Sequence, residues 1–172
     1  MMKKRLTSLA LSAMMVLSMV PATAFAAKDA GTPPTYNSAT GCYEISTPAQ
    51  LLYLAGKWKD GAPRDGHYVL TADIDMTGVK GFKPIASKKD EGFTGTFDGQ
   101  FHSIKGLRVE YEKKYAGLFG YVGNQDDQAY IKNVALLDCY VTGQQNVGAL
   151  AGVNYGTITD CVVTGEVKCL DL

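Results

Sequence analysis

The sequence predicts an all-β protein built as a β-solenoid, with one short helix ahead of it. From His67 onward, β-type runs of four to seven residues are separated by glycine, Asp or Asn, which is typical of many short strands. Related segments recur at fixed spacings, and repeated units of this size bury their apolar faces only by stacking on one another. Only one segment after the N-terminal leader has apolar residues at helical spacing.

Residues 1–26 have the pattern of a secretory signal peptide. A basic start, an apolar run over residues 6–20 and the small-residue sequence PATAFAA follow in the expected order, with cleavage predicted after Ala26. The apolar run is short for a membrane span, and no second long apolar run follows it. We therefore expect a secreted or extracellular protein, possible attachment to the cell surface, and no membrane span.

Charge and length narrow the class of protein further. The whole chain has 17 Lys and Arg against 17 Asp and Glu, and three of the basic residues lie in the leader, which leaves a mature net charge of −3. This balance makes nucleic acid an unsuitable partner. The mature length suits one domain, and residues 27–41, which are small, polar and proline-containing, are predicted to form a flexible N-terminal arm.

Residues 42–62 are predicted to form an N-terminal cap that contains the helix. Thr47 is placed to cap the helix, Pro48 suits its first position, and Gln50 completes a capping box. Gly61 is expected to end the helix, whose apolar face is formed by Leu51, Leu52, Leu54, Ala55 and Trp58.

Residues 63–172 contain the repeats of the solenoid. The segments IKGLRV, IKNVAL and ITDCVV begin at Ile104, Ile131 and Ile158, at a constant spacing of 27. GLFG and ALAG recur at a spacing of 32, and DCYVTG and DCVVTG at a spacing of 22. Two five-residue expansions, near GNQDDQ and ALLD, account for the differences, so the spacing at which the coils stack is left open between 22, 27 and 32.

The stacked positions are predicted to be mainly structural. Neighbouring parallel strands lie about 4.8 Å apart, so Leu118 and Leu150 should stack inside the solenoid. Glycines are expected where a Cβ would clash or where φ is positive. The repeat-motif residues are Gly117, Leu118, Phe119, Gly120, Leu150, Gly152, Ile104, Ile131 and Ile158.

At these motifs the chain resembles the GLUG-repeat proteins, which are secreted or surface proteins of bacteria. The resemblance extends from GLFG to TADIDM, FTGTFDGQFHSIKGL and NYGTITDCVVTG, and covers about residues 43–167. It implies a right-handed parallel β-helix in an adhesin-like exported protein, sometimes beside a peptidase module. Ala149 departs from the motif's first glycine, and no C-terminal cap follows, so the chain is expected to be part of a longer array or to self-associate through the exposed C-terminal edge.

Acidic residues and histidines are candidates for catalytic or metal sites. Asp73 and Asp75 share one face of a strand, and Asp98 lies four residues before His102, as in carboxylate-based polysaccharide cleavage or calcium binding. A turn at Asp98 and an outward position for the other two aspartates explain these residues as well. Neither His67 nor His102 has a cysteine or a third imidazole near it in the sequence, so zinc binding is not predicted. No catalytic residue, metal or cofactor is therefore assigned.

The four cysteines enter an oxidising compartment without forming a zinc pattern. Cys161 matches inward positions of the Ile template, so we expect it in the core. If the 22-residue register holds, Cys139 and Cys161 face each other and a disulfide between them is possible.

Six tyrosines are predicted at strand ends or on outward positions, where they suit contact with a sugar or a protein surface. They are Tyr111, Tyr115, Tyr121, Tyr130, Tyr140 and Tyr155. The function that follows is a non-catalytic, adhesin-like surface module that binds extracellular glycans or proteins. The alternatives are a polysaccharide-cleaving enzyme, an accessory region of a secreted enzyme such as a peptidase, and a spacer without a ligand.

Overall fold

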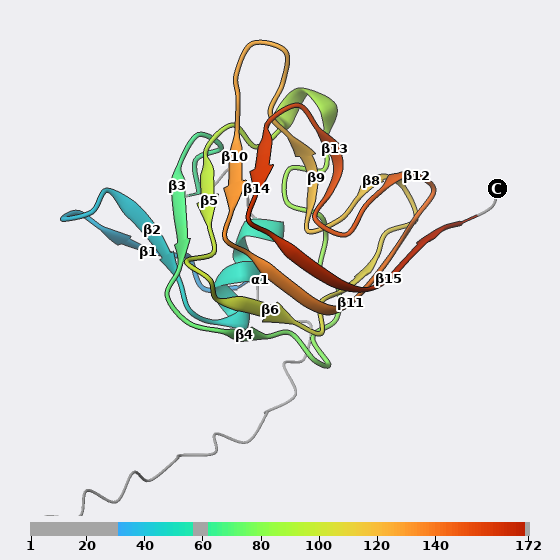
Figure 1. Ribbon diagram of the computed structural model, residues 1–172, viewed down its shortest axis with the longest axis horizontal. Helices are drawn as coiled ribbons and strands as arrows, with labels where there is room; N and C mark the ends of the chain where they lie inside the picture. Colours follow the sequence, from blue (N-terminus) through green and yellow to red (C-terminus); the bar gives the residue numbers. More distant parts are fainter. Residues whose placement is uncertain (1–30, 57–61, 171–172) are drawn as a thin grey trace, which may run out of the picture.

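The computed structural model describes residues 31–56 and 62–170, and the chain forms a β-solenoid of about three turns with one short α-helix (Figure 1). This confirms the predicted fold class. The predicted signal peptide, Trp58 and Gly61 lie outside the described residues.

Four sheets run along the stack of coils. The largest sheet has the order β1-β2-β3-β5-β10-β14, and a second sheet has the order β15-β11-β6-β4, with β7 also paired to β11. Two small sheets pair β8 with β12 and β9 with β13. Apart from the antiparallel pair of β1 and β2, every strand pair is parallel.

The order of the strands follows the path of the chain around the coils. The early strands are β1 (Thr35–Asn37), β2 (Cys42–Ile45), β3 (His67–Leu70), β4 (Ile74–Asp75) and β5 (Thr96–Asp98). The next are β6 (Ser103–Lys105), β7 (Arg108–Glu110), β8 (Lys114–Ala116), β9 (Phe119–Val122) and β10 (Tyr130–Lys132). The last are β11 (Ala135–Gly143), β12 (Gln145–Val147), β13 (Ala151–Asn154), β14 (Thr157–Thr159) and β15 (Val162–Cys169).

The core is a column of apolar side chains inside the coils. Tyr68, Phe97, Ile104 and Leu118 are all 0% exposed. Aromatic rings run through the stack, from Tyr68 to Phe93 with centroids 6.0 Å apart and from Phe93 onward to Phe119 at 5.1 Å. Since each unit cannot bury its apolar face alone, this column is what couples one coil to the next.

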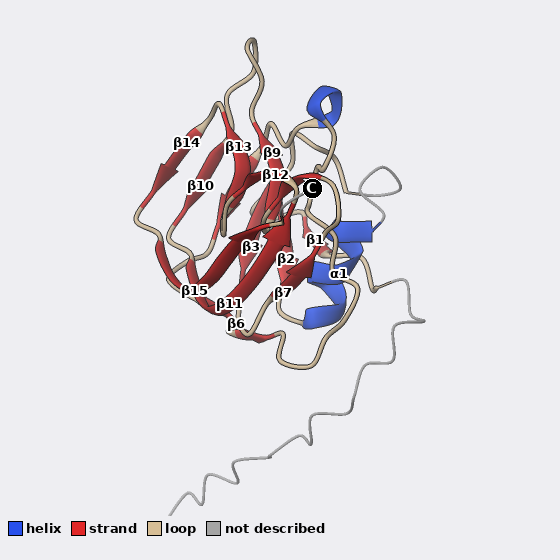
Figure 2. Ribbon diagram, turned by 90° about the vertical axis from the view of Figure 1, so that its right-hand side faces the viewer, coloured by secondary structure: helices blue, strands red, loops and turns tan. Residues whose placement is uncertain are grey.

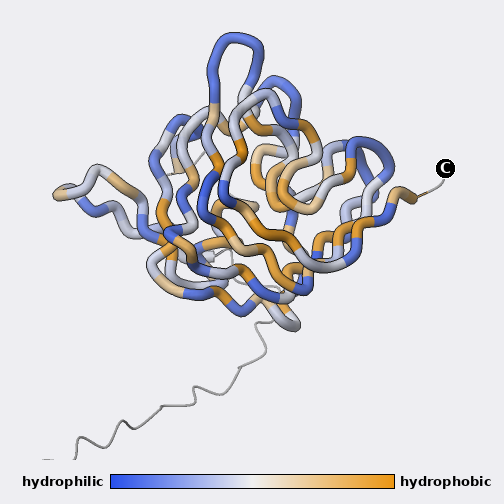
Figure 3. Tube along the Cα trace, viewed as in Figure 1, coloured by the Kyte–Doolittle hydropathy of each residue, from blue (hydrophilic) through white to orange (hydrophobic). Residues whose placement is uncertain are grey.

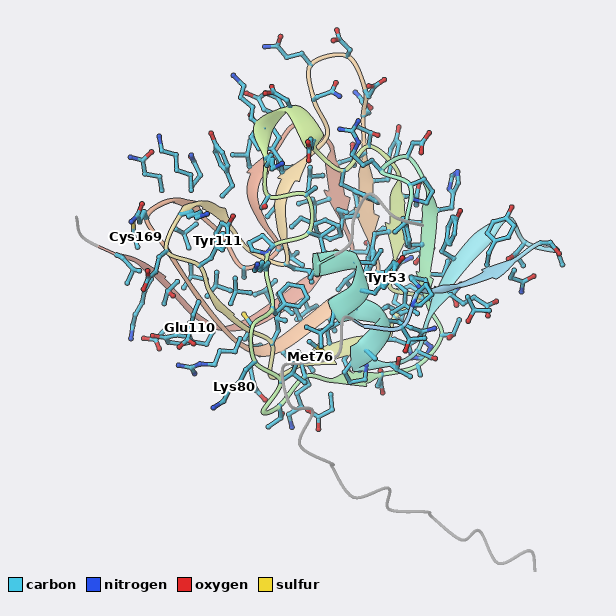
Figure 4. The ribbon with its side chains drawn as sticks, turned by 180° about the vertical axis from the view of Figure 1, so that it is seen from behind. Tyr53, Met76, Lys80, Glu110, Tyr111 and Cys169 are labelled. Atoms are coloured by element: carbon cyan, nitrogen blue, oxygen red, sulfur yellow. The ribbon has the colours of Figure 1, made fainter. Side chains whose placement is uncertain are left out.

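Helix α1 (Pro48–Gly56) lies at the end of the stack opposite β14 and β15 (Figure 2). The predicted capping box is present in part. The Gln50 backbone N–H donates to Thr47 Oγ1 at 3.3 Å, but Gln50 Oε1 accepts from the Ser46 backbone N–H, at 2.8 Å, rather than from that of Thr47. Leu51 and Leu54 are buried, and the labelled Tyr53 lies on this helix in the view from behind (Figure 4). The helix therefore covers apolar side chains at the first coil.

Part of the segment predicted to be a flexible arm, residues 27–41, forms a strand. Strand β1 pairs with β2, with Tyr36 opposite Tyr43, and the turn between them closes through the Gly41 backbone N–H, which donates to the Asn37 carbonyl at 2.8 Å. The rings of Tyr36 and Tyr43 lie 4.9 Å apart. This pairing gives order that the polar, proline-containing composition does not predict.

The register of the coils varies along the stack. Of the three spacings left open by the sequence, 27 and 32 occur between described strands and 22 does not. Ile158 lies opposite Ile131 as predicted, but Ile104 lies opposite Leu136 rather than Ile131. Gly165, not Cys161, lies opposite Cys139. The 22-residue alternative is therefore excluded, and the 27-residue spacing of the three Ile segments is a stacking spacing only between Ile131 and Ile158.

A recurring backbone corner explains both errors. Gly106, Asn133, Asp138 and Asp160 all have φ between 52° and 68°. Each has an apolar residue two positions before it and another directly after it, and the sequence repeats this pattern. One coil contains two such corners, at Asn133 and Asp138. The strand register stacks Asp160 on Asn133 and Asp138 on Gly106. A repeated sequence pattern therefore marks a corner of this kind, but it does not show which corner of the next coil lies opposite. Asn and Asp tolerate this conformation better than other side chains do.

The last glycines of GLFG and ALAG, Gly120 and Gly152, allow close approach between backbones. A Cβ on Gly120 would lie 2.6 Å from the Cα of Ser87, and one on Gly152 would lie 2.6 Å from the Asn146 carbonyl oxygen. Leu118 is buried, and its backbone N–H donates to the Ala149 carbonyl at 2.9 Å. As predicted, a side chain at either position would clash with neighbouring backbone. Neither glycine has a positive φ, so the close approach alone requires glycine there.

Strand β15 forms the exposed side of the last described coil. All of its residues are exposed, including Val162, Val163 and Val167, and the hydropathy colouring shows an apolar stretch there (Figure 3). Within the described residues, no helix has both the length and the apolar character needed to cross a membrane.

Candidate functional site

A cavity of 340 Å³ lies between two loops of the solenoid. One loop carries the short 3₁₀ helix η1 (Lys89–Glu91), and the other is the 123–129 loop, the polar segment that connects β9 to β10 and projects from the stack (Figure 1). We call this the tyrosine cavity. Its volume falls in the range of about 300–1,000 Å³ that is typical of small-molecule sites.

Two tyrosines from neighbouring coils form the aromatic wall of the tyrosine cavity. Tyr121 belongs to β9, and Tyr155 directly follows β13, which pairs with β9. Their rings are stacked, with centroids 5.8 Å apart, and Tyr155 is 50% exposed. Tyr115 contacts Tyr121 edge-on at 5.3 Å. In the register of β9 with β13, Val153 lies opposite Tyr121. Tyr155 follows two residues after Val153, so its ring stacks on Tyr121 from a diagonal position in the neighbouring coil.

Tyr121 itself is only 5% exposed, so its predicted outward, accessible position is wrong. The ring of Tyr155 stacks on one side of it, and the Gly92 backbone passes close by. Burial, together with a hydrogen bond with Tyr155, raises the pKa of the Tyr121 hydroxyl. Tyr121 therefore supports and orients Tyr155, which presents the accessible ring face.

The opposite side of the tyrosine cavity is polar. Asn124, Gln125 and Asp126 line it from the 123–129 loop, and Lys89 and Asp90 line it from η1. Asn124 organises its loop, since Asn124 Oδ1 accepts from the backbone N–H groups of Asp126 at 2.7 Å and Asp127 at 2.6 Å. Amides, carboxylates and an ammonium group beside an exposed ring are suited to hydroxyl-rich ligands, which need both an apolar face and many hydrogen-bond partners.

The other predicted tyrosines do not join this site. Tyr140 lies on β11, with the Arg108 guanidinium carbon 4.3 Å and the Lys168 Nζ 5.4 Å from its ring centroid. Tyr130 is 47% exposed, and its hydroxyl contacts Gln128 Oε1 at 3.4 Å, on the other side of the 123–129 loop. Tyr111 follows β7 and packs against the core, and it is labelled in the view from behind (Figure 4).

The candidate carboxylates hold the backbone rather than converging on a groove. Asp73 accepts from the Ser103 backbone N–H at 2.7 Å, and this bond, with others from Ser103 and His102, lowers the pKa of Asp73. Bonds from Thr77 lower the pKa of Asp75 in the same way. His102 Nδ1 lies 3.4 Å from Asp73, so this histidine pairs with Asp73 and not with Asp98.

Asp98 joins two coils. Its Oδ1 accepts from Asn133 Nδ2 at 2.9 Å and from the Gln100 backbone N–H at 2.8 Å, and Lys132 Nζ lies 3.2 Å from Oδ2. Burial acts to raise the pKa of Asp98, but these bonds outweigh it and the pKa is lowered. Among the described residues, no group of three or more His, Cys, Asp or Glu side chains is placed to hold a metal ion.

The predicted disulfide is not present, because all four cysteines are free. Cys139 is buried in β11 beside Gly165, and Cys161 lies next to Val162, which pairs with Ala135. Burial raises the pKa of both thiols. Cys161 is half-buried and packs against the core, as expected.

Sequence reasoning found the two rings of the tyrosine cavity but missed its polar side. Lys89 and Asp90 belong to no repeat and match no motif. The GNQDDQ segment gave a usable signal, because an expansion in a repeat unit places extra residues in a loop, where binding residues are commonly found.

Comparisons with known proteins find two relatives by sequence and one solved structure with a similar fold. No protein-family model matches it, so membership of the GLUG-repeat family stays an expectation. Over 135 residues, covering 73% of this chain, it is 35% identical to halomucin of Haloquadratum walsbyi. Over 130 residues, covering 70% of this chain, it is 33% identical to a proposed Gly-rich membrane protein of Evansella cellulosilytica. The chain spans 1% and 14% of the lengths of these two relatives.

A solved structure has a similar fold. It is that of a proposed immunoglobulin A1 protease from Bacteroides ovatus, with a TM-score of 0.59 and 22% sequence identity. The similarity covers 79% of this chain and 39% of the other. At this level of identity the match concerns the fold alone.

Proposed function

We propose that this chain is a non-catalytic module of an extracellular or cell-surface protein, and that it binds glycans at the tyrosine cavity. The observation that carries the proposal is the half-exposed ring of Tyr155, held on Tyr121 at the wall of a 340 Å³ cavity with a polar opposite side. A rigid aromatic face beside amide and carboxylate groups fits a sugar ring and its hydroxyls.

The relatives support the extracellular part of the proposal. One is a halomucin and the other is described as a membrane protein, and each is far longer than the segment that this chain matches. A repeat segment within a long exported protein is compatible with the signal peptide predicted for residues 1–26. A spacer without a ligand shares these features, but it gives no reason for the organised cavity.

A polysaccharide-cleaving enzyme has less support. Asp73, Asp75 and Asp98 are each engaged by hydrogen bonds to nearby backbone or side-chain groups, with lowered pKa values, whereas a general acid needs a pKa near the working pH. The fold shared with a proposed protease leaves a role beside a peptidase as an alternative.

The test is retention of residues 27–172 on a panel of immobilised mucins and polysaccharides, with released reducing ends measured in the same wells. We expect saturable retention without release of reducing ends. Release of reducing ends would contradict the non-catalytic part of the proposal, and absence of retention on every surface would favour the spacer.

A further inference from the structure

A second cavity is also lined by the 123–129 loop and shares Asp126 with the tyrosine cavity. Its volume is 480 Å³, and its lining includes Arg64, Asp65, Thr94 and Asp127. The two cavities are also joined through the protein, because Arg64 Nη1 donates to the Asp90 carbonyl oxygen at 3.1 Å. We call the second cavity the acidic cavity.

Charge is unevenly distributed over the two cavities. Asp65, Asp90, Asp126 and Asp127 face only two basic side chains, Arg64 and Lys89, which leaves a net charge of −2. All six residues are exposed, so their charges act on a ligand in solution and are weakened by salt. The Arg64 guanidinium is also partly engaged by the Asp90 carbonyl, which lowers its availability to an anion.

Resting on the proposed function, we infer that the tyrosine cavity and the acidic cavity form one extended site for a neutral oligosaccharide. One sugar packs on Tyr155, the chain passes Asp126, and following sugars occupy the acidic cavity, where carboxylates accept hydrogen bonds from hydroxyl groups. Uronic, sialylated or sulfated sugars would bring negative charge next to four carboxylates, so the site selects against them.

The experiment compares matched glycans that differ in charge and not in backbone. Residues 27–172 are titrated with mucin before and after enzymatic removal of sialic acid, and with pectin of high and low methyl esterification, at low and high salt. We expect the neutral member of each pair to bind about tenfold more tightly at low salt, with the difference shrinking as salt screens the carboxylates.

Two variants locate the effect. Asp126→Asn combined with Asp127→Asn should lower the ratio of neutral to anionic affinity about threefold or more, since it removes two of the four carboxylates. Glu112→Gln removes one exposed carboxylate away from both cavities and should leave the ratio unchanged.

The outcomes separate this inference from the proposed function. Equal or tighter binding of the anionic members, or an unchanged ratio in the double variant, overturns the inference and leaves glycan binding in place. Preference for a single sugar over its oligomers overturns the extended site. No binding of any probe overturns the proposed function itself.

Discussion

At the scale of single residues, glycines set how closely neighbouring coils approach. Gly120 lies against the backbone of Ser87 and Ala86, and no side-chain movement there could make room for a Cβ. Gly56, at the end of α1, has no atom within 4 Å of the position of an added Cβ. Replacing Gly120 should therefore destabilise the fold more than replacing Gly56, although both glycines occur in regular secondary structure.

Gly120→Ala should lower the free energy of unfolding by about 2 kcal/mol, because overpacking against backbone is relieved only by moving a strand. Urea unfolding followed by circular dichroism measures this. Gly56→Ala is the matched control and should leave stability unchanged or slightly raised. Equal stability of the two variants would show that the coils are less closely packed at Gly120 than described.

Asp98 gives a pH-dependent prediction. Its pKa is lowered in the folded protein, so its contribution to stability is present above the unfolded pKa of about 4 and is lost as pH falls through the folded value. Asp98→Asn should cost about 1–2 kcal/mol at pH 7, since charge-assisted bonds to Lys132 and Asn133 are weakened. The stability of the Asp98→Asn variant should also fall less steeply than that of the wild type as the pH drops below 5.

Thermal unfolding measured between pH 2 and pH 7 tests both parts, with Glu112→Gln as a control for removing one exposed carboxylate. A variant curve parallel to that of the wild type would contradict the role of Asp98 as a link between coils.

At the scale of secondary-structure elements, the corners with positive φ fix where the strands turn. Asp160 is exposed, has φ of 52° and stacks on Asn133. Asp160→Val should lower the free energy of unfolding by about 1–2 kcal/mol, because a β-branched residue is strained in this conformation. Asp160→Gly should be neutral by comparison. Equal losses of stability for the two substitutions, measured by chemical denaturation, would contradict the claim that positive φ at Asp160 disfavours a β-branched residue.

These corners also show why sequence predicted the elements better than their register. Short strands, the capping box and the inward positions of Ile131, Ile158 and Leu118 could be recognised from spacing alone. The corners at Asn133 and Asp138 have the same local sequence pattern within one coil, so a repeat search cannot tell which of them stacks on Gly106. That choice depends on the lengths of the loops and on core packing around the whole coil.

The tyrosine cavity was predictable only in part for a related reason. Tyr121 and Tyr155 lie within strand-like segments whose repeat could be seen, whereas η1 and its Lys89 and Asp90 occur once. Which loop folds over which strand is decided by contacts such as the Phe93 backbone N–H with the Tyr121 carbonyl, at 2.9 Å. No local sequence pattern encodes such a contact.

At the scale of the whole molecule, β15 is the outermost of the described strands in its sheet. Val163 and Val167 lie opposite the inward residues Leu136 and Val141, yet they are 42% and 44% exposed. An exposed apolar strand with unpaired backbone groups favours pairing with another strand. We therefore expect the 172-residue chain to self-associate with rising concentration, as measured by sedimentation velocity.

Val163→Lys combined with Val167→Lys should make the protein monomeric at concentrations where the wild type associates. Thr159→Lys places one such charge on an exposed position of the same coil and should leave the association unchanged. A wild-type chain that stays monomeric at high concentration would contradict self-association through this strand.

The central claim is that this solenoid binds glycans through Tyr155, and calorimetric titration with the most strongly retained glycan tests it most directly. Tyr36 is the matched control, since it is 56% exposed and contacts a second tyrosine, but lies on the hairpin of β1 and β2. We predict that Tyr155→Ala weakens binding about tenfold or more, equivalent to about 1.4 kcal/mol, while Tyr36→Ala leaves affinity within about twofold. Wild-type affinity in Tyr155→Ala, or equal losses in both variants, would contradict the claim.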